Sequence, residues 1–171
     1  LMYTTAWYTD MANHGPEESR EKYQDLLDLH IPICKSFGTD QGSEVANLGI
    51  QVLGGVGFTK DFPLEQNVRD QKIGSIYEGT NGIQALDLVG RKFNTKNGQL
   101  LKVLLDELCW FDQHSPEGEL KGWVAEWETY SILMQKCIAS LKKTGEAEGK
   151  DGYVLYASNM LDLMGDVLCC F

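Results

Sequence analysis

The amino-acid sequence predicts an all-α protein folded as a bundle of amphipathic helices. Apolar residues recur every three to four positions through most of the chain, as the buried face of a helix requires. No stretch longer than four residues alternates convincingly between apolar and polar side chains, so we expect essentially no sheet. Short connections separate the long helical segments, which favours a bundle.

Length and composition indicate a small globular protein. The chain has 171 residues, of which 43% are hydrophobic and 10% aromatic. A chain of this size can bury one core, or one core with a small satellite.

The amino-terminal part of the chain predicts helices punctuated by proline. Residues 1–13 form an expected helix that ends before Pro16, because proline cannot continue it. A second helix begins at Pro16, where proline and two glutamates suit a first turn. We expect a break or kink at Pro32, since the residue before a proline is pushed out of helical geometry.

Residues 33–53 predict a further helix with a buried apolar stripe. Its glycines, Gly38, Gly42 and Gly49, indicate close helix contacts or a ligand lying on the surface. The stripe consists of Ile33, Phe37, Val45, Leu48, Val52 and Leu53.

A glycine-rich run, Gly54-Gly55-Val56-Gly57, follows this helix. A phosphate-binding loop is one interpretation, but no strand precedes the run and no Gly-Lys-Ser/Thr follows it. The pattern alone favours a helix carboxyl-terminal cap followed by a turn.

Two more helices are expected before residue 93. The first begins at Pro63 and continues through Ile73. The second follows the connector Tyr77-Glu78-Gly79-Thr80, with Thr80 as its amino-terminal cap. Its expected apolar residues are Ile83, Leu86, Leu88 and Val89. Residues 94–97 are polar and predict a linker.

Three helices are expected after the linker, over residues 99–113, 120–142 and 151–171, with turns at 115–118 and 144–146. Aromatic and methionine side chains at helical spacing predict core positions rather than a cofactor site. These positions are Leu101, Leu104, Leu105, Leu108, Phe111, Trp123, Trp127, Tyr130, Met134, Cys137, Leu141, Tyr153, Tyr156, Met160, Met164, Val167 and Phe171.

Charge and cysteine usage exclude several classes of protein. The net charge of −10 repels nucleic acid and anionic lipid. The five cysteines form no Cys-x-x-Cys pair, and the three histidines lie too far apart for metal ligation, so we expect no metal site. We find no leader sequence and no apolar run near 18 residues, so no transmembrane segment is expected. Free thiols then indicate a cytoplasmic location, or the mitochondrial matrix in a eukaryote.

The chain opens on Leu1-Met2 within an apolar helical pattern, without a cap. Native chains rarely begin inside a helix, so this start predicts the back end of a longer protein.

Glu78 is the candidate catalytic residue. It lies in a short connector followed by Gly79 and Gly82, where the backbone can hold a carboxylate against a ligand. Periodicity alone also allows an ordinary solvated loop acid.

Several motifs together resemble the closing signature of the acyl-CoA dehydrogenase family. They are Gln51-Val52-Leu53-Gly54-Gly55-Val56-Gly57-Phe58, Pro63-Leu64-Glu65, Arg69-Asp70, Ile76-Tyr77-Glu78-Gly79-Thr80 and Ile83-Gln84. Residues 1–93 resemble the carboxyl-terminal helical domain of that family, with its first helix missing. The sequence of residues 77–92 resembles in particular the subgroup with an added helical carboxyl-terminal extension. Residues 98–171 fit that extension in position and in helical character.

The resemblance implies FAD as cofactor and an acyl-CoA as substrate. Family members bind FAD between an amino-terminal helical domain, a middle β domain and this domain. Glu78 matches the base that removes the α-proton, and Gly79 matches the position beside the thioester. Thr80 and Gln84 match flavin-contacting positions. The segment Gln51, Val52, Leu53, Gly54 and Gly55 matches the one that meets the FAD of a neighbouring subunit.

The implied reaction is the α,β-dehydrogenation of an acyl-CoA to a trans-2-enoyl-CoA, in a homo-oligomer of at least two subunits. An electron-transfer flavoprotein is one candidate electron acceptor. The fragment alone is expected to be inactive. Two alternatives are an acyl-CoA oxidase of the same fold and a non-catalytic helical oligomerisation module. Arg69 has two interpretations, a structural ion pair with Glu65, which we favour, or support of the FAD site.

Overall fold

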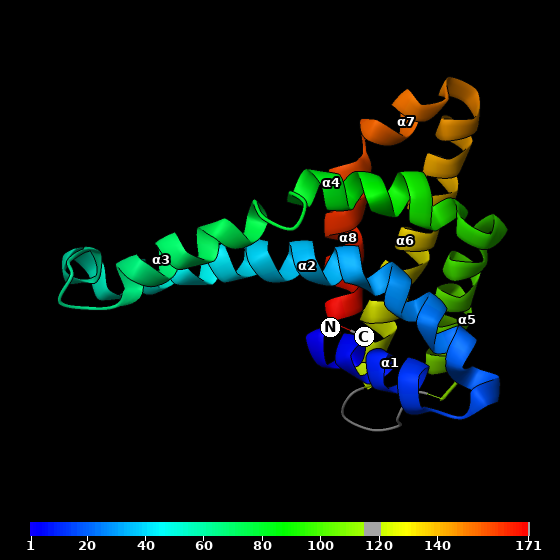
Figure 1. The fold of residues 1–171 in the computed structure, drawn as a ribbon, viewed down its shortest axis with the longest axis horizontal. Coiled ribbons are helices and arrows are strands. Elements are labelled where there is room, and N and C mark those ends of the chain that lie inside the picture. The colour runs from blue at the N-terminus through cyan, green and yellow to red at the C-terminus, as the bar shows by residue number, and fades with distance from the viewer. Residues whose placement is uncertain (115–120, 171) are drawn as a thin grey trace.

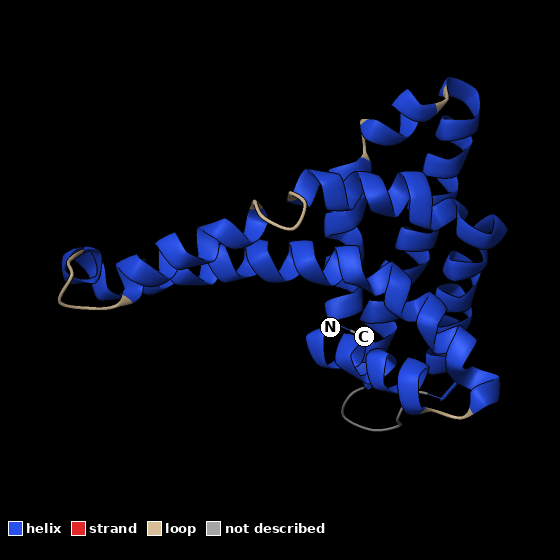
Figure 2. Cartoon of the chain, in the orientation of Figure 1, coloured by secondary structure: helices blue, strands red, loops and turns tan. Residues whose placement is uncertain are grey.

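Helices form nearly all of the structure. The computed structural model describes residues 1–114 and 121–170, without the side chains of 110–114 and 150. The expected turn at 115–118, the side chain of Phe111 and residue Phe171 lie outside this description. No β-strand occurs among the described residues, so the all-α prediction is confirmed for them (Figure 2). The elements are α1 (Met2–His14), α2 (Glu17–Leu53), η1 (Gly54–Phe58), α3 (Leu64–Lys72), η2 (Ile73–Ser75), α4 (Asn81–Leu86), η3 (Asp87–Arg91), η4 (Lys92–Gly98), α5 (Gln99–His114), α6 (Lys121–Glu148), α7 (Lys150–Val154) and α8 (Ala157–Cys170).

The long helix α2 connects the two parts of the molecule. Its amino-terminal half packs inside a bundle with α1, α5, α6 and α8, and its carboxyl-terminal half leaves that bundle (Figure 1). There α3 folds back along it, and the two helices with η1 and η2 form a projecting arm (residues 40–76).

Of the break or kink predicted at Pro32, the break is wrong, because α2 continues through this residue. The ribbon of α2 changes direction near this point (Figure 1). A proline inside a helix removes one backbone hydrogen bond and crowds the preceding turn, which bends the helix. Pro32 is buried, and the packing of its neighbours Leu29 and Ile33 outweighs this local penalty.

One hydrophobic core extends through the bundle. It takes fully buried side chains from α2, from the segment after α4, and from α5, α6 and α8. The members with no exposed surface include Leu26, Leu29, Ile33, Leu88, Phe93, Leu104, Leu108, Met134 and Met164. Because these residues come from both sides of 94–97, the two parts of the chain share this core. The domain boundary at 94–97 stays a prediction.

The expected linker is a tight turn fixed by charge. Lys96 and Asn97, with φ of 49° and 58°, turn the chain within η4. The Lys96 ammonium contacts Asp25 at 2.7 Å and Glu21 at 2.8 Å on α2. These hydrogen bonds raise the pKa of Lys96. Asp25 is almost fully buried, so Lys96 neutralises a carboxylate that would otherwise lose its hydration without compensation.

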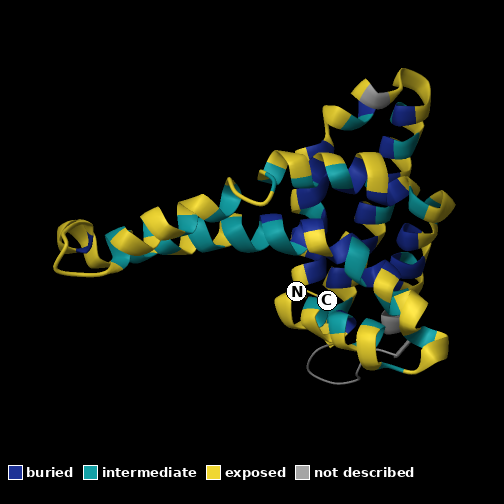
Figure 3. Cartoon of the chain, viewed as in Figure 1, coloured by how far each residue is buried: buried dark blue, intermediate teal, exposed yellow. Residues whose placement is uncertain are grey.

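The buried stripe predicted over 33–53 is correct only near the bundle. Among residues 37–84, all of which the structure describes, Gly57 alone is buried (Figure 3). Val45, Leu48 and Val52 expose 64%, 56% and 84% of their surface. The periodicity correctly indicated an apolar helix face, but α3 covers a different face of α2.

The glycines of α2 explain how α3 approaches. A Cβ atom on Gly42 would lie 2.6 Å from the Gln71 amide nitrogen, and one on Gly49 would lie 3.4 Å from Leu64 Cδ1. Of the two interpretations, close helix contact therefore applies to Gly42 and Gly49. At Gly38 the same test finds open space.

Three predicted core aromatics in the carboxyl-terminal part are exposed instead. Trp123, Tyr130 and Tyr156 expose 72%, 50% and 50% of their surface. The stripe on α6 is shifted, and its buried residues are Trp127, Ser131, Met134, Ile138, Leu141 and Gly145. The single helix expected over 151–171 is divided into α7 and α8 by a turn at Leu155 and Tyr156. In α7, the ring of Tyr153 packs directly over Gly145, which fixes α7 against α6.

Helix α8 docks on α2 through a glycine. Phe37 lies so close to Gly165 that a Cβ atom there would be 2.5 Å from the ring.

Among the described helices, none combines the length and the apolar composition that a membrane-spanning segment requires.

Gly165→Ala should destabilise the fold, because the added methyl group overpacks the contact with Phe37. We expect the free energy of unfolding to fall by about 1–3 kcal/mol in urea titrations. Gly38→Ala is the matched control, since it adds a methyl group in open space within a helix and should raise stability by about 0.5–1 kcal/mol. Equal effects from both substitutions would contradict the close contact.

His30 should make the stability depend on pH. Its ring is buried, its Nδ1 donates to the Leu26 carbonyl at 2.8 Å, and its edge packs on Tyr8. Burial lowers the pKa of His30 from 6.5 to about 4. The unfolded chain therefore binds more protons between these two values, and acidification through this window destabilises the folded state by up to about 3 kcal/mol.

The measurement is the free energy of unfolding at several pH values for His30→Gln, which removes the titrating ring and keeps a donor. The variant should lose this part of the pH dependence. His14→Gln, at the exposed end of α1, is the control and should leave it unchanged. An unaltered slope in His30→Gln would refute the assignment.

Candidate functional site

The connector that carries Glu78 lies where the arm meets the bundle, between η2 and α4 (Figure 1). Glu78 and Gly79 both have left-handed backbone conformations, with φ of 55° and 83°. Such a conformation is unfavourable for a residue with a side chain, and non-glycine examples concentrate at functional sites. At Gly79 the left-handed φ itself favours glycine, and a Cβ atom there would also lie 2.9 Å from the side-chain nitrogen Nε2 of Gln84.

Side chains hold both carbonyl groups of this turn. Gln84 Nε2 donates to the Glu78 carbonyl at 3.1 Å, and Lys35 Nζ donates to the Gly79 carbonyl at 2.7 Å. Lys35 also donates to Asn81 Oδ1 at 2.7 Å. The backbone around Glu78 is therefore fixed from α4 on one side and from α2 on the other.

Sequence reasoning missed Lys35, Thr39 and Asn81 as parts of the site. In the sequence, Lys35 stands out only as a lysine within an apolar helical segment. Helical periodicity cannot predict that it contacts a turn 44 residues away. The tertiary structure provides that connection.

Thr80 caps α4 as predicted. Its hydroxyl oxygen accepts a hydrogen bond from the backbone N–H of Ile83 at 3.3 Å, which satisfies one free donor of the first turn. The same hydroxyl retains its own proton for donation, and Thr80 is exposed.

The second group of predicted cofactor residues lies at the far end of the arm. Gly54 ends α2 with a φ of 63°, so the expected helix cap is confirmed. Gln51, Val52 and Leu53 are exposed, and a Cβ atom on Gly54 or Gly55 would meet nothing within 4 Å. The structure does not bring this group together with Glu78, since the two lie at opposite ends of the arm (Figure 1).

Arg69 on α3 forms the predicted ion pair with Glu65, at 3.0 Å.

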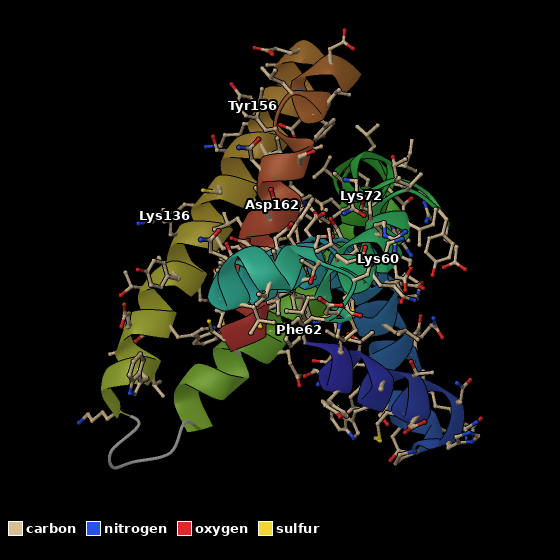
Figure 4. All side chains as sticks on the ribbon, turned by 90° about the vertical axis from the view of Figure 1, so that its left-hand side faces the viewer. Lys60, Phe62, Lys72, Lys136, Tyr156 and Asp162 are labelled. Carbon is tan, nitrogen blue, oxygen red and sulfur yellow. The ribbon has the colours of Figure 1, made fainter. Side chains whose placement is uncertain are left out.

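Figure 4 shows the arm from its tip. Lys72 lies on α3, and Lys60 and Phe62 lie at the tip, whereas Lys136 lies on α6, apart from the arm. Phe62 is 40% exposed and Phe58 is 78% exposed.

The side chain of Glu78 is open to solvent, and two of its exposed neighbours are apolar. Glu78, Tyr77 and Ile83 are all exposed, and Tyr77 and Ile83 each show more than half of their surface.

Comparison with known proteins assigns the family. The family model described as "Acyl-CoA dehydrogenase, C-terminal domain" matches residues 2–93, which include α2, the arm and the Glu78 turn. The chain belongs to the acyl-CoA dehydrogenase family. The family resemblance predicted from the motifs is thereby confirmed.

Three proteins similar to this chain are named as dehydrogenases. A 3-methylmercaptopropionyl-CoA dehydrogenase of Ruegeria pomeroyi is 40% identical over 126 residues, which are 73% of this chain and 21% of that protein. A butyryl-CoA dehydrogenase of Syntrophomonas wolfei is 30% identical over 170 residues, 99% of this chain and 28% of that protein. A broad-specificity linear acyl-CoA dehydrogenase of Mycobacterium tuberculosis is 35% identical over 131 residues, 76% of this chain and 20% of that protein.

This acyl-CoA dehydrogenase domain therefore spans between 20% and 28% of the length of these relatives. The alignment with the Syntrophomonas protein covers nearly the whole chain, so it includes the helices after residue 93.

Thr80→Ala should weaken the start of α4. The loss of the capping hydroxyl is expected to lower the free energy of unfolding by about 1 kcal/mol in urea titrations. Thr80→Ser keeps the hydroxyl and should remain close to the wild type. If both variants were equally destabilised, the methyl group rather than the cap would be the stabilising element.

Proposed function

We propose that this chain supplies the catalytic base of an FAD-dependent acyl-CoA dehydrogenase, with Glu78 in that role. The observation that carries the proposal is the left-handed turn at Glu78 and Gly79, with both of its carbonyl groups held by side chains. A solvated loop acid has no need of such a strained and anchored backbone. The proposed reaction converts an acyl-CoA to a trans-2-enoyl-CoA.

Glu78 would take the proton from the α-carbon of the thioester. An ordinary glutamate, with a pKa of about 4.3, is a weak base, so catalysis requires that the carboxylate be shielded from water. The exposed side chains around it, Tyr77 and Ile83, provide an apolar surface that a bound acyl-CoA would cover. Gly79, which has no side chain, leaves room beside the turn for the thioester.

Two groups of residues fit FAD. At the turn, Thr80 keeps an exposed hydroxyl donor, and Gln84 carries an amide. At the tip, the exposed Gln51 with the unobstructed backbone of Gly54 and Gly55 fits a hydrogen-bonding ligand from outside this chain. When bound, FAD would accept the hydride that leaves the β-carbon.

The distance between these groups supports an oligomer. One chain cannot place both ends of its own arm on the same flavin site when they lie at its base and at its tip. We propose that the tip, with Val52 and Leu53, meets the FAD of a neighbouring subunit. The exposed apolar side chains of the arm are consistent with an interface of this kind. An electron acceptor, for which an electron-transfer flavoprotein is one candidate, completes the proposed cycle.

Glu78→Gln in the full-length protein that contains this chain should abolish flavin reduction by acyl-CoA. Glutamine has nearly the same shape but cannot accept the proton, so we expect the rate of bleaching of the flavin absorbance to fall by at least about 1,000-fold while FAD stays bound. Anaerobic stopped-flow absorbance measures this rate.

Glu44→Gln, an exposed acid on the arm, is the matched control and should reduce its flavin normally. Retained turnover in Glu78→Gln would refute the assignment of the base. Loss of assembly with unaltered chemistry would favour the oligomerisation module. Oxygen consumption without an added electron acceptor would indicate an oxidase.

A further inference from the structure

Lys35, on α2, forms two hydrogen bonds with the Glu78 turn. Lys35 is half-buried, and its ammonium group uses two of its three donors on this one turn. The acceptors are the carbonyl of Gly79 and the side-chain oxygen of Asn81, both at 2.7 Å. Charged donors at this distance form hydrogen bonds about twice as strong as neutral ones.

The bond to Gly79 acts where the backbone is least stable. Glu78 would relax to a right-handed or extended conformation if the carbonyl after it were released, because left-handed geometry is unfavourable for a residue with a side chain. Such a change in φ and ψ redirects the whole side chain. The contact from Gln84 holds only the preceding carbonyl.

A further layer of hydrogen bonds orients this contact. Asn81 Nδ2 donates to the Thr39 hydroxyl at 3.0 Å, and that hydroxyl donates to the Lys35 carbonyl at 2.9 Å. Asn81 must therefore present its oxygen, not its nitrogen, to the ammonium group. Lys35 and Thr39 lie one helical turn apart on α2, so a rigid part of the fold carries the whole arrangement.

We propose that Lys35 is a positioning residue for Glu78, an inference that rests on the proposed function of Glu78 as the base. Lys35 acts through the Gly79 carbonyl and through Asn81, and holds the turn in the conformation that directs the carboxylate toward the α-carbon. A purely structural lysine would contribute to stability and leave the rate of proton abstraction unchanged.

The test is Lys35→Met in the full-length protein with FAD bound, since methionine keeps most of the apolar stem and removes the ammonium group. We expect the rate constant of flavin reduction to fall by about 100-fold, because misplacement of a catalytic group by 1 Å can have an effect of this size. The KM for acyl-CoA should change by less than about threefold, and the FAD content should be unchanged. The kinetic isotope effect with substrate deuterated at the α-carbon should increase.

A second readout does not depend on activity. Amide hydrogen exchange of the peptide covering residues 76–84 should be faster in Lys35→Met, since the turn loses its anchor. Lys35→Arg should recover the rate of flavin reduction to within about tenfold, because a guanidinium group can reach both acceptors. Lys136→Met, on the outer side of α6, is the control and should behave as the wild type (Figure 4).

The outcomes separate this inference from the proposed function. If Glu78→Gln is inactive and Lys35→Met reduces its flavin at the wild-type rate, the positioning role is wrong and the base assignment stands. If Glu78→Gln is active, the proposed function is wrong and the positioning role falls with it.

If Lys35→Met does not fold, the milder variant Asn81→Ala tests the same proposal. Asn81→Ala leaves Lys35 with only the Gly79 carbonyl and should slow flavin reduction by about tenfold with little change in KM. A wild-type rate in Asn81→Ala would then overturn the proposal.

Discussion

The packing of the amino-terminal half of α2 into the bundle is the interaction on which the rest of the structure depends. Leu26, Leu29 and Ile33 are fully buried there, and Asp25 on the same helix neutralises the lysine that fixes the turn before α5. Because α2 continues without a break, a rigid helix anchored in the core extends directly to the turn that holds Glu78 and then into the arm.

The helices after residue 98 form part of the same core. Met164 on α8 is as fully buried as Leu88, which follows α4. The close contact between Gly165 and Phe37 places α8 against α2, and α8 also packs on α4. The helix that begins immediately after the Glu78 turn is thus supported by α8, which gives the last helix a structural role in the same core.

The arm has the opposite character. Its two helices contact each other through small residues such as Gly42, and they leave an apolar face with Val52 exposed. A hairpin of this length cannot bury its own apolar surface, because each helix has only one neighbour. A face of this kind is typical of proteins whose arm is covered by another domain or subunit. The turn with Glu78 lies at the base of the arm, where such a cover would also enclose the carboxylate.

The sequence by itself determined the all-α fold class, most helix positions, the cap at Thr80 and the family, because helical periodicity and capping are local and the motifs are contiguous. Only the tertiary structure decided that Val45 is exposed and that Lys35 reaches the Gly79 carbonyl. Periodicity indicates that a helix face is apolar, but it does not predict which element packs against that face. A hydrogen bond between residues 44 positions apart depends on how helices pack, which no local pattern encodes.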